Sequence, residues 1–231
     1  MKVNCLLCDT FSEIFTNEFT SYILMFRNLF DSVHSDTEYE IFDVREEIYP
    51  RTLNNDDIYL IPGSNAGAYD DTLWVQTLIK FIRKMYMENV KIAGVCFGHQ
   101  IIAQALGGKT EKAVQGWGAG VRTSNIIDSK AIAYFPDKTM NLHYNHHDQV
   151  TELPPQAVCF AQSDFCPYEG FYINNRIITF QGHPEYTADY SRYLLLNHSD
   201  DEPEDVKLKA LDSLSLKVDS LSAAKWILNL N

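Results

Sequence analysis

Apolar and polar positions follow two periods over roughly the first 110 residues, and this pattern predicts an α/β fold. Short apolar runs with the length of strands lie at 3–8, 39–44, 58–61 and 91–95. An apolar stripe at helical spacing runs through 21–30, and a second stripe begins at Trp74, behind the N-cap chemistry of Asp70-Asp71-Thr72. Strands that alternate with helices predict a parallel sheet with helices on both faces.

The pattern changes in the second half, where strands follow one another directly. Strand-like runs lie at 121–127, 131–135, 170–173 and 176–180. Asn174-Asn175 tolerates positive φ and predicts a type I′ hairpin turn between the last two runs. The acidic stretch at about 197–205 predicts a mobile surface loop, and 208–216 and 222–230 predict closing helices, the second burying Trp226. We expect residues 1–231 to form a single domain.

The composition excludes several classes of partner. Hydrophobic residues make up 45% of the 231 positions and aromatic residues 13%, which indicates a folded chain with a sizeable core. A net charge of −12 disfavours nucleic acid and anionic membranes, since both are bound through basic patches. No apolar run approaches the ~20 residues of a membrane helix, and the N-terminal segment is unlike a signal peptide.

The number of cysteines is odd, which argues against a disulfide framework. Among the five, Cys5 and Cys8 have C-x-x-C spacing, but they lie in an apolar strand with no second pair at metal-like spacing. Packing is therefore favoured over zinc or redox chemistry for this pair. We expect a reducing, cytoplasmic compartment.

One cysteine stands where a strand meets a helix, in Gly94-Val-Cys96-Phe-Gly98. A nucleophile in such a tight turn needs neighbours without bulk, and the two glycines provide this. The helix N-terminus behind Cys96 favours negative charge on its sulfur. The alternative is an inert buried cysteine, which describes most free cysteines. A base close to Cys96 would favour the nucleophile over the inert cysteine.

The segment Gly182-His183-Pro-Glu185 contains that candidate base. His183 can accept the thiol proton, and Glu185 can orient the imidazole and stabilise its charged form. Residues two apart in an extended segment point to the same side, so the two side chains can meet. By itself this tripeptide would indicate a surface loop, but together with the cysteine elbow it predicts a Cys96–His183–Glu185 triad.

Two further segments are candidates for the same site. Gly63 follows a strand, so its N–H can form an oxyanion hole with the amide of Phe97. Ser64 is a weaker candidate for the same role. The alternative is that Gly63 only forms an ordinary glycine turn. Three histidines at 143, 146 and 147 resemble a metal site, but no carboxylate or cysteine completes a set. We expect a polar loop that lines the pocket here, bordered by the flexible segment 116–120, with no metal and no cofactor.

Four motifs together resemble class I, triad-type glutamine amidotransferases, most closely the stand-alone group that includes plant γ-glutamyl peptidases. They are Gly-Val-Cys96-Phe-Gly-His-Gln, the Pro-Gly63-Ser loop, His146-His-Asp-Gln-Val and Gly-His183-Pro-Glu185, and they occur in the family's order. The resemblance implies an α/β fold with a flavodoxin-like, parallel or mixed central sheet and helices on both faces. Ser64 departs from the family, which has a second glycine there.

The resemblance also implies a reaction. Cys96 would attack the γ-amide of glutamine or of a γ-glutamyl compound, and Gln100 with Tyr144, Asn145 and His146 would hold the glutamyl α-amino and α-carboxylate groups. Three alternatives remain open: a glutaminase subunit that supplies ammonia to a synthetase partner, a non-catalytic protein that retains the fold, and the stress-protein and intracellular-protease group with a similar elbow. The presence of all three triad residues argues against a non-catalytic protein. The His-Pro-Glu segment favours a glutaminase over the stress-protein and protease group.

Overall fold

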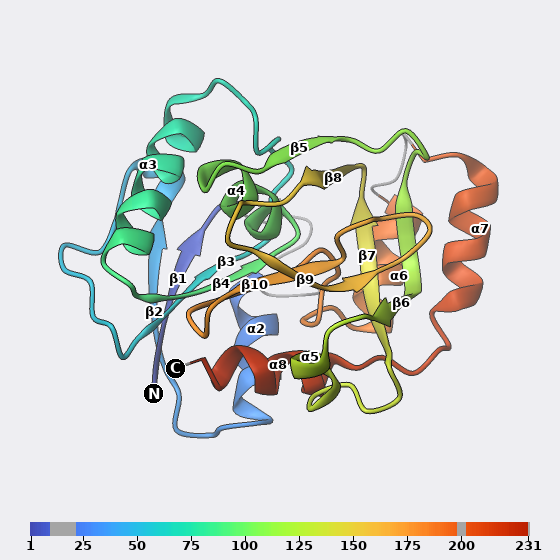
Figure 1. Ribbon diagram of the computed structural model, residues 1–231. Coiled ribbons are helices and arrows are strands. Elements are labelled where there is room, and N and C mark those ends of the chain that lie inside the picture. Colours follow the sequence, from blue (N-terminus) through green and yellow to red (C-terminus); the bar gives the residue numbers. More distant parts are fainter. Residues whose placement is uncertain (10–21, 198–201, 231) are drawn as a thin grey trace.

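The computed structural model describes residues 1–9, 22–197 and 202–230, and a nine-stranded mixed sheet forms its centre (Figure 1). Half of this sheet is parallel. Its strands lie in the order β2 (Glu38–Asp43), β1 (Lys2–Leu7), β3 (Ile58–Ile61), β4 (Lys91–Val95) and β11 (Ile177–Phe180). The register pairs Val95 with Phe180, so the segments that follow β4 and β11 leave the sheet side by side.

The other half of the sheet is antiparallel. It continues from β11 through β10 (Gly170–Ile173), β9 (Val158–Gln162), β6 (Gly118–Ile126) and β7 (Thr139–His146). A separate two-stranded sheet pairs β5 (Lys109–Lys112) with β8 (Asp148–Glu152).

Helices cover both faces of the sheet, as the burial of consecutive residues in β3, β4 and β11 requires. In β3, Ile58 and Leu60 face a core that includes α2 (Tyr22–Asp31) and α8 (Ser220–Leu228), with Trp226 buried as predicted. Tyr59 and Ile61 face the opposite core, under α3 (Leu73–Met87) and α4 (Phe97–Ala105). The predicted fold class is confirmed.

Shorter elements complete the chain. A 3-10 turn, η1 (Val44–Glu46), follows β2, and α5 (Ser129–Ile132) follows β6. Helices α6 (Ala188–Asn197) and α7 (Glu204–Ser213) come after β11, and α7 packs against β6 at the antiparallel side of the sheet (Figure 1).

Several local predictions were wrong, each for a local reason. Residues 131–135 do not form a strand: the Asp128 carboxylate accepts from the N–H of Lys130 at 2.9 Å and starts helix α5 instead. The hairpin at 170–180 is present, but its turn contains three residues and only Asn174 has positive φ, at 54°. A two-residue type I′ turn would need two such residues.

The expected polar loop at 143–150 is also different, because most of it lies in β7 and β8. Helix α7 begins inside the stretch 197–205 that was predicted as a loop, and residues 198–201 of that stretch lie outside the described residues. Helix α6 was not predicted.

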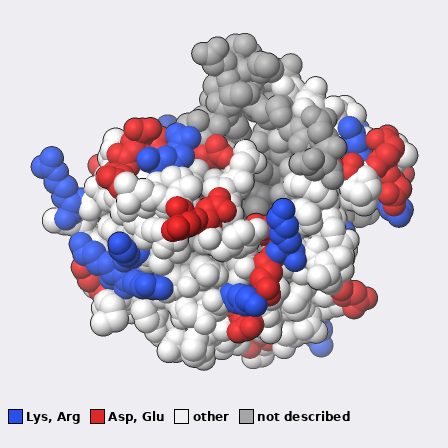
Figure 2. Space-filling model, turned by 90° about the horizontal axis from the view of Figure 1, so that it is seen from above, with Lys and Arg blue, Asp and Glu red and all other residues white. Residues whose placement is uncertain are grey.

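Charged side chains are dispersed over the face of the molecule that Figure 2 shows. Figure 2 looks down on the end of the molecule toward which β1 points, and the visible basic and acidic groups are interspersed there with uncharged residues. In the described segments, no helix is long and apolar enough to cross a membrane.

Candidate active site

Cys96 occupies a strained elbow between β4 and α4. Its φ of 52° and ψ of −104° are rare for a residue with a side chain. The backbone on either side holds this conformation, because the Cys96 N–H donates to the carbonyl of Phe180 at 2.9 Å and its own carbonyl accepts from Gln100 at 3.0 Å. The cysteine side chain is therefore presented at the carboxyl end of the parallel strands.

The two glycines around Cys96 are required by close backbone contacts. A Cβ on Gly98 would collide with the carbonyl group of Ile61, and one on Gly94 would lie 2.7 Å from the carbonyl carbon and oxygen of Gly98. The Gly98 N–H donates to the carbonyl of Pro62 at 3.1 Å. Helix α4 can thus start directly against β3 and β4, as the glycine spacing predicted.

His183 and Glu185 follow β11, the parallel neighbour of β4. The His183 Nδ1 lies 2.8 Å from Glu185 Oε1, and both side chains are buried. The His183 N–H donates to the carbonyl of His143 at 2.7 Å, which ties this segment to β7. With Nδ1 engaged by the carboxylate, Nε2 is the ring nitrogen free for proton transfer.

The electrostatic setting of His183 favours the imidazolium. Burial alone lowers its pKa, but the Glu185 carboxylate and the Cys96 sulfur outweigh burial and raise the pKa to about 10. The opposing charges on its two sides are the physical cause. The structure thus brings the three predicted triad residues together.

An aromatic ring that the sequence analysis did not identify covers His183. Tyr186 stacks on the imidazole with ring centroids 3.9 Å apart and planes 11° apart, and its hydroxyl lies 2.6 Å from that of Tyr22. A Cβ on Gly63 would be 3.0 Å from His183 Cε1 and 2.6 Å from the Tyr22 hydroxyl. Glycine at 63 therefore allows the loop after β3 to lie against the histidine. No apolar period along the sequence points to Tyr186, because its stacking on His183 forms only in the folded chain.

A pocket of about 760 Å³ opens beside Cys96. Gln100, Asn145 and His146, three of the four predicted substrate-binding residues, line it. The side chain of Gln100 is held by bonds from its Nε2 to the Asp148 carbonyl at 2.7 Å and to Gln181 Oε1 at 3.2 Å. The first of these bonds holds the side chain of Gln100, which belongs to α4, against the first residue of β8.

Tyr144, the fourth predicted binding residue, is not part of the pocket lining. Its ring is buried in the core, and its hydroxyl lies 3.0 Å from the Ser124 hydroxyl. Asn145 and His146, the two residues that follow it in β7, both line the pocket, so the pocket wall begins one residue beyond Tyr144.

The predicted oxyanion residues border the elbow. The Ser64 hydroxyl donates to the carbonyl of Cys8 at 2.9 Å and accepts from the N–H of Ala66 at 3.2 Å, so it ties its loop to the end of β1. Phe97 is the first residue of α4, where amides have no acceptor within the helix. Gly63 thus follows the end of β3, and Phe97 follows Cys96 at the end of the neighbouring strand β4.

The histidines of β7 do not converge. His143 bonds through Nδ1 to the Ser191 hydroxyl at 2.9 Å, and His146 bonds through Nδ1 to the Asp148 carbonyl at 3.0 Å. Burial lowers the pKa of His143 to about 4 and that of His146 to about 3, so both are neutral. Within the part of the chain that the structure describes, no group of three His, Cys, Asp or Glu side chains is arranged to hold a metal.

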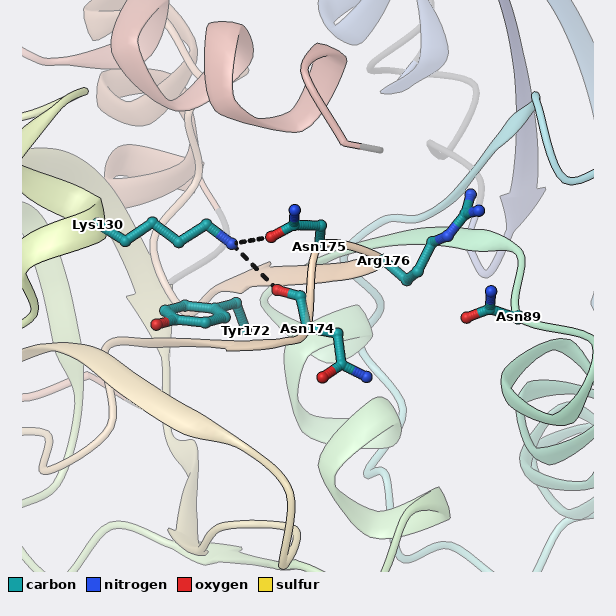
Figure 3. Close-up of a pocket in the computed structure, with 6 residues that line it drawn as sticks. All are labelled: Asn89, Lys130, Tyr172, Asn174, Asn175 and Arg176. Carbon is teal, nitrogen blue, oxygen red and sulfur yellow. Dashed lines mark hydrogen bonds between the residues drawn. The ribbon is translucent and has the colours of Figure 1, made fainter.

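A different hollow, of about 590 Å³, lies at the other end of the sheet, where β4 begins and the β10–β11 hairpin turns (Figure 3). The Lys130 ammonium already bonds to the Asn174 carbonyl at 3.0 Å and to Asn175 Oδ1 at 2.5 Å, above the ring of Tyr172. None of its lining residues is a cysteine, histidine or carboxylate. This hollow therefore contains none of the residue types of the Cys96, His183 and Glu185 cluster.

Comparison with known proteins identifies the family. Residues 21–199 match the model of class-I glutamine amidotransferases, so the chain belongs to this family, as the four motifs predicted. The Saccharomyces cerevisiae protein YLR126C is 34% identical over 178 residues, which are 74% of this chain and 70% of that protein. Gamma-glutamyl peptidase 3 of Arabidopsis thaliana is 32% identical over 190 residues, covering 79% of this chain and 75% of its own.

Solved structures show the same fold. A glutamine amidotransferase from Thermotoga maritima superposes with a TM-score of 0.73 at 17% identity, over 98% of this chain and 95% of that one. One from Methylobacillus flagellatus gives a TM-score of 0.74 at 18% identity, over 99% and 91% of the two chains.

Proposed function

We propose that this protein is a cysteine-dependent hydrolase of γ-glutamyl amide bonds, with Cys96 as nucleophile, His183 as general base and acid, and Glu185 as the group that orients His183. One observation carries the proposal: the strained Cys96 elbow and the buried His183–Glu185 pair lie together at the ends of two adjacent parallel strands. Within the pair, His183 Nδ1 is 2.8 Å from Glu185 Oε1. Activated nucleophiles are built in this way.

In the proposed reaction, the thiol of Cys96 passes its proton to Nε2 of His183, and its sulfur attacks the γ-carbonyl carbon of the substrate. The oxygen of the resulting tetrahedral intermediate carries the negative charge, and the amides of Phe97 and of Gly63, or of Ser64 instead, donate to it. His183 protonates the departing amine, the C–N bond breaks, and a glutamyl thioester remains. Water then loses a proton to His183 and attacks the thioester, which releases glutamate and restores the thiol.

Glu185 and Tyr186 would both act through His183. A carboxylate at Nδ1 selects the tautomer that leaves Nε2 toward the sulfur, and it stabilises the imidazolium that forms during each transfer. The stacked ring of Tyr186 restricts rotation of the imidazole and offers its π-face to the positive charge.

The pocket favours a substrate larger than glutamine. We propose that Gln100, Asn145 and His146 hold the α-amino and α-carboxylate groups of the glutamyl part. A volume of about 760 Å³ lies in the range of clefts that hold drug-sized ligands, so a leaving group larger than ammonia has room. The plant relative is itself named a peptidase of γ-glutamyl compounds.

The test is release of glutamate by the purified chain from glutamine and from γ-glutamyl dipeptides, without ATP or a partner. We expect the dipeptides to be cleaved at least as well as glutamine. Weak turnover of glutamine that rises on addition of a partner, with no peptide cleavage, would identify a glutaminase subunit instead. Absence of any glutamate release, together with no labelling of Cys96 by a glutamine-like diazoketone, would contradict the catalytic proposal.

A further inference from the structure

A second cavity, of about 330 Å³, adjoins the candidate active site and shares Trp117 with the pocket that contains Cys96. On its wall, Phe165 packs edge-on against His146 of the larger pocket, with ring centroids 5.8 Å apart. A Cβ on Gly118 would lie 2.6 Å from His146 Nε2 and 2.9 Å from Phe165. Glycine at 118 therefore lets His146 of the larger pocket and Phe165 of the second cavity pack together, so the two cavities are neighbours with Trp117 in the lining of both.

Helix α7 forms the far wall of this second cavity. Gly120 has φ of 77°, and a Cβ there would lie 2.6 Å from the Cα of Ala210, so the helix sits directly on β6. The Ser213 hydroxyl accepts from the N–H of Val121 at 2.8 Å and donates to the Ala210 carbonyl at 2.6 Å. These bonds fix α7, and Lys209 on this helix belongs to the cavity lining.

The charged groups of the cavity are cationic. The Arg122 guanidinium lies 4.2 Å from the centroid of the Phe165 ring, and Lys209 of helix α7 lines the same cavity. Among the described residues that line the cavity, none is acidic. Lys209 forms an ion pair with Asp205 at 3.3 Å, but both side chains are mostly exposed, so water screens this pair.

These charges select a class of ligand. The whole chain carries a net charge of −12, so two cations on one small cavity mark a local preference for an anion. A guanidinium presents paired donors that match the two oxygens of a carboxylate. The floor is apolar, with Ala119, Val121 and Ala210 all buried, which suits the side chain of an amino acid.

We propose that this cavity binds the free carboxylate of an amino acid or peptide attached to the γ-glutamyl group. The inference rests on the proposed function, and it names the leaving side of the substrate as one that ends in a carboxylate. Arg122 would donate to that carboxylate, Lys209 would add attraction across the cavity, and Trp117 would cover the connecting segment.

The test compares a γ-glutamyl amino acid with its C-terminal amide, which has nearly the same size but no negative charge. Wild type is expected to show kcat/KM roughly tenfold to hundredfold higher for the acid, the usual effect of a charge-assisted hydrogen bond. In Arg122→Gln this ratio should fall to about one, and in Lys209→Gln it should fall by a smaller factor. Two variants on different elements guard against a folding defect in either one.

Arg176→Gln is the matched control. Arg176 lies on the β10–β11 hairpin at the opposite end of the sheet (Figure 3), so this variant should keep the full preference for the acid. Equal hydrolysis of acid and amide by wild type, or an unchanged ratio in Arg122→Gln, would overturn the subsite but leave the proposed function standing. Failure to release glutamate from either compound would overturn the proposed function, and the subsite with it.

Discussion

Replacing Glu185 by glutamine removes one negative charge beside His183 and changes little else. The amide oxygen of glutamine can still accept from Nδ1–H, so the position of the ring is kept. The two side chains are only 2% and 0% exposed, and water therefore screens them poorly. Unit charges about 4 Å apart at an effective dielectric of about 20 attract by ~4 kcal/mol. At ~1.36 kcal/mol for each tenfold, this corresponds to a rate loss of ~10³.

We expect kcat of Glu185→Gln to fall by roughly 10²–10⁴-fold, with little change in KM, since Glu185 is not part of the Cys96 pocket lining. The pH profile should change as well. Burial lowers the pKa of His183, while Glu185 and Cys96 raise it to about 10. Without the carboxylate, the pKa falls and the alkaline limb of kcat moves to lower pH. Initial rates of glutamate release across the pH range measure both effects.

Glu169→Gln is the control for this experiment. Glu169 is also buried, but its carboxylate accepts from the Ser163 hydroxyl at 2.6 Å and does not touch His183. The control should leave the alkaline limb of the profile in place. A steep rise in KM at unchanged kcat in Glu185→Gln, or an alkaline limb that does not move, would refute the assigned role.

Three further predictions concern the same site. A glutamine-like diazoketone should label Cys96 in preference to the other cysteines, and Cys96→Ala should abolish turnover while the protein stays folded, as judged by circular dichroism. Tyr186→Leu should lower kcat by roughly threefold to tenfold at unchanged KM, and Tyr186→Phe should recover most of it, since stacking on His183 is worth about 0.5–1.5 kcal/mol. Gly98→Ala should cost about 1–3 kcal/mol in urea unfolding, because its Cβ would collide with the Ile61 carbonyl; unchanged stability would contradict this reading of the elbow.

Features that depend on neighbours in the chain were predictable. The spacing of Gly94 and Gly98 around Cys96 predicted a tight strand-to-helix turn, because lack of bulk at those positions is a local requirement. The alternation of strand and helix in the first half predicted a parallel sheet. The pairing of β11 with β4, which brings His183 to the cysteine, joins distant segments and was decided by the tertiary structure. The prediction of a strand at 131–135 from residue propensity was wrong, because Asp128 caps a helix that begins at Ser129.

Features that depend on contacts between distant segments required the tertiary structure. The sequence by itself determined the fold class and the residues that could carry the chemistry, because glycine spacing, apolar period and side-chain type are local properties. The stacking of Tyr186 on the imidazole, the burial of Tyr144 away from the pocket and the place of Arg122 beside Phe165 follow from packing across the sheet. Such contacts join residues whose separation along the chain has no period, so only the folded arrangement decides which of them meet.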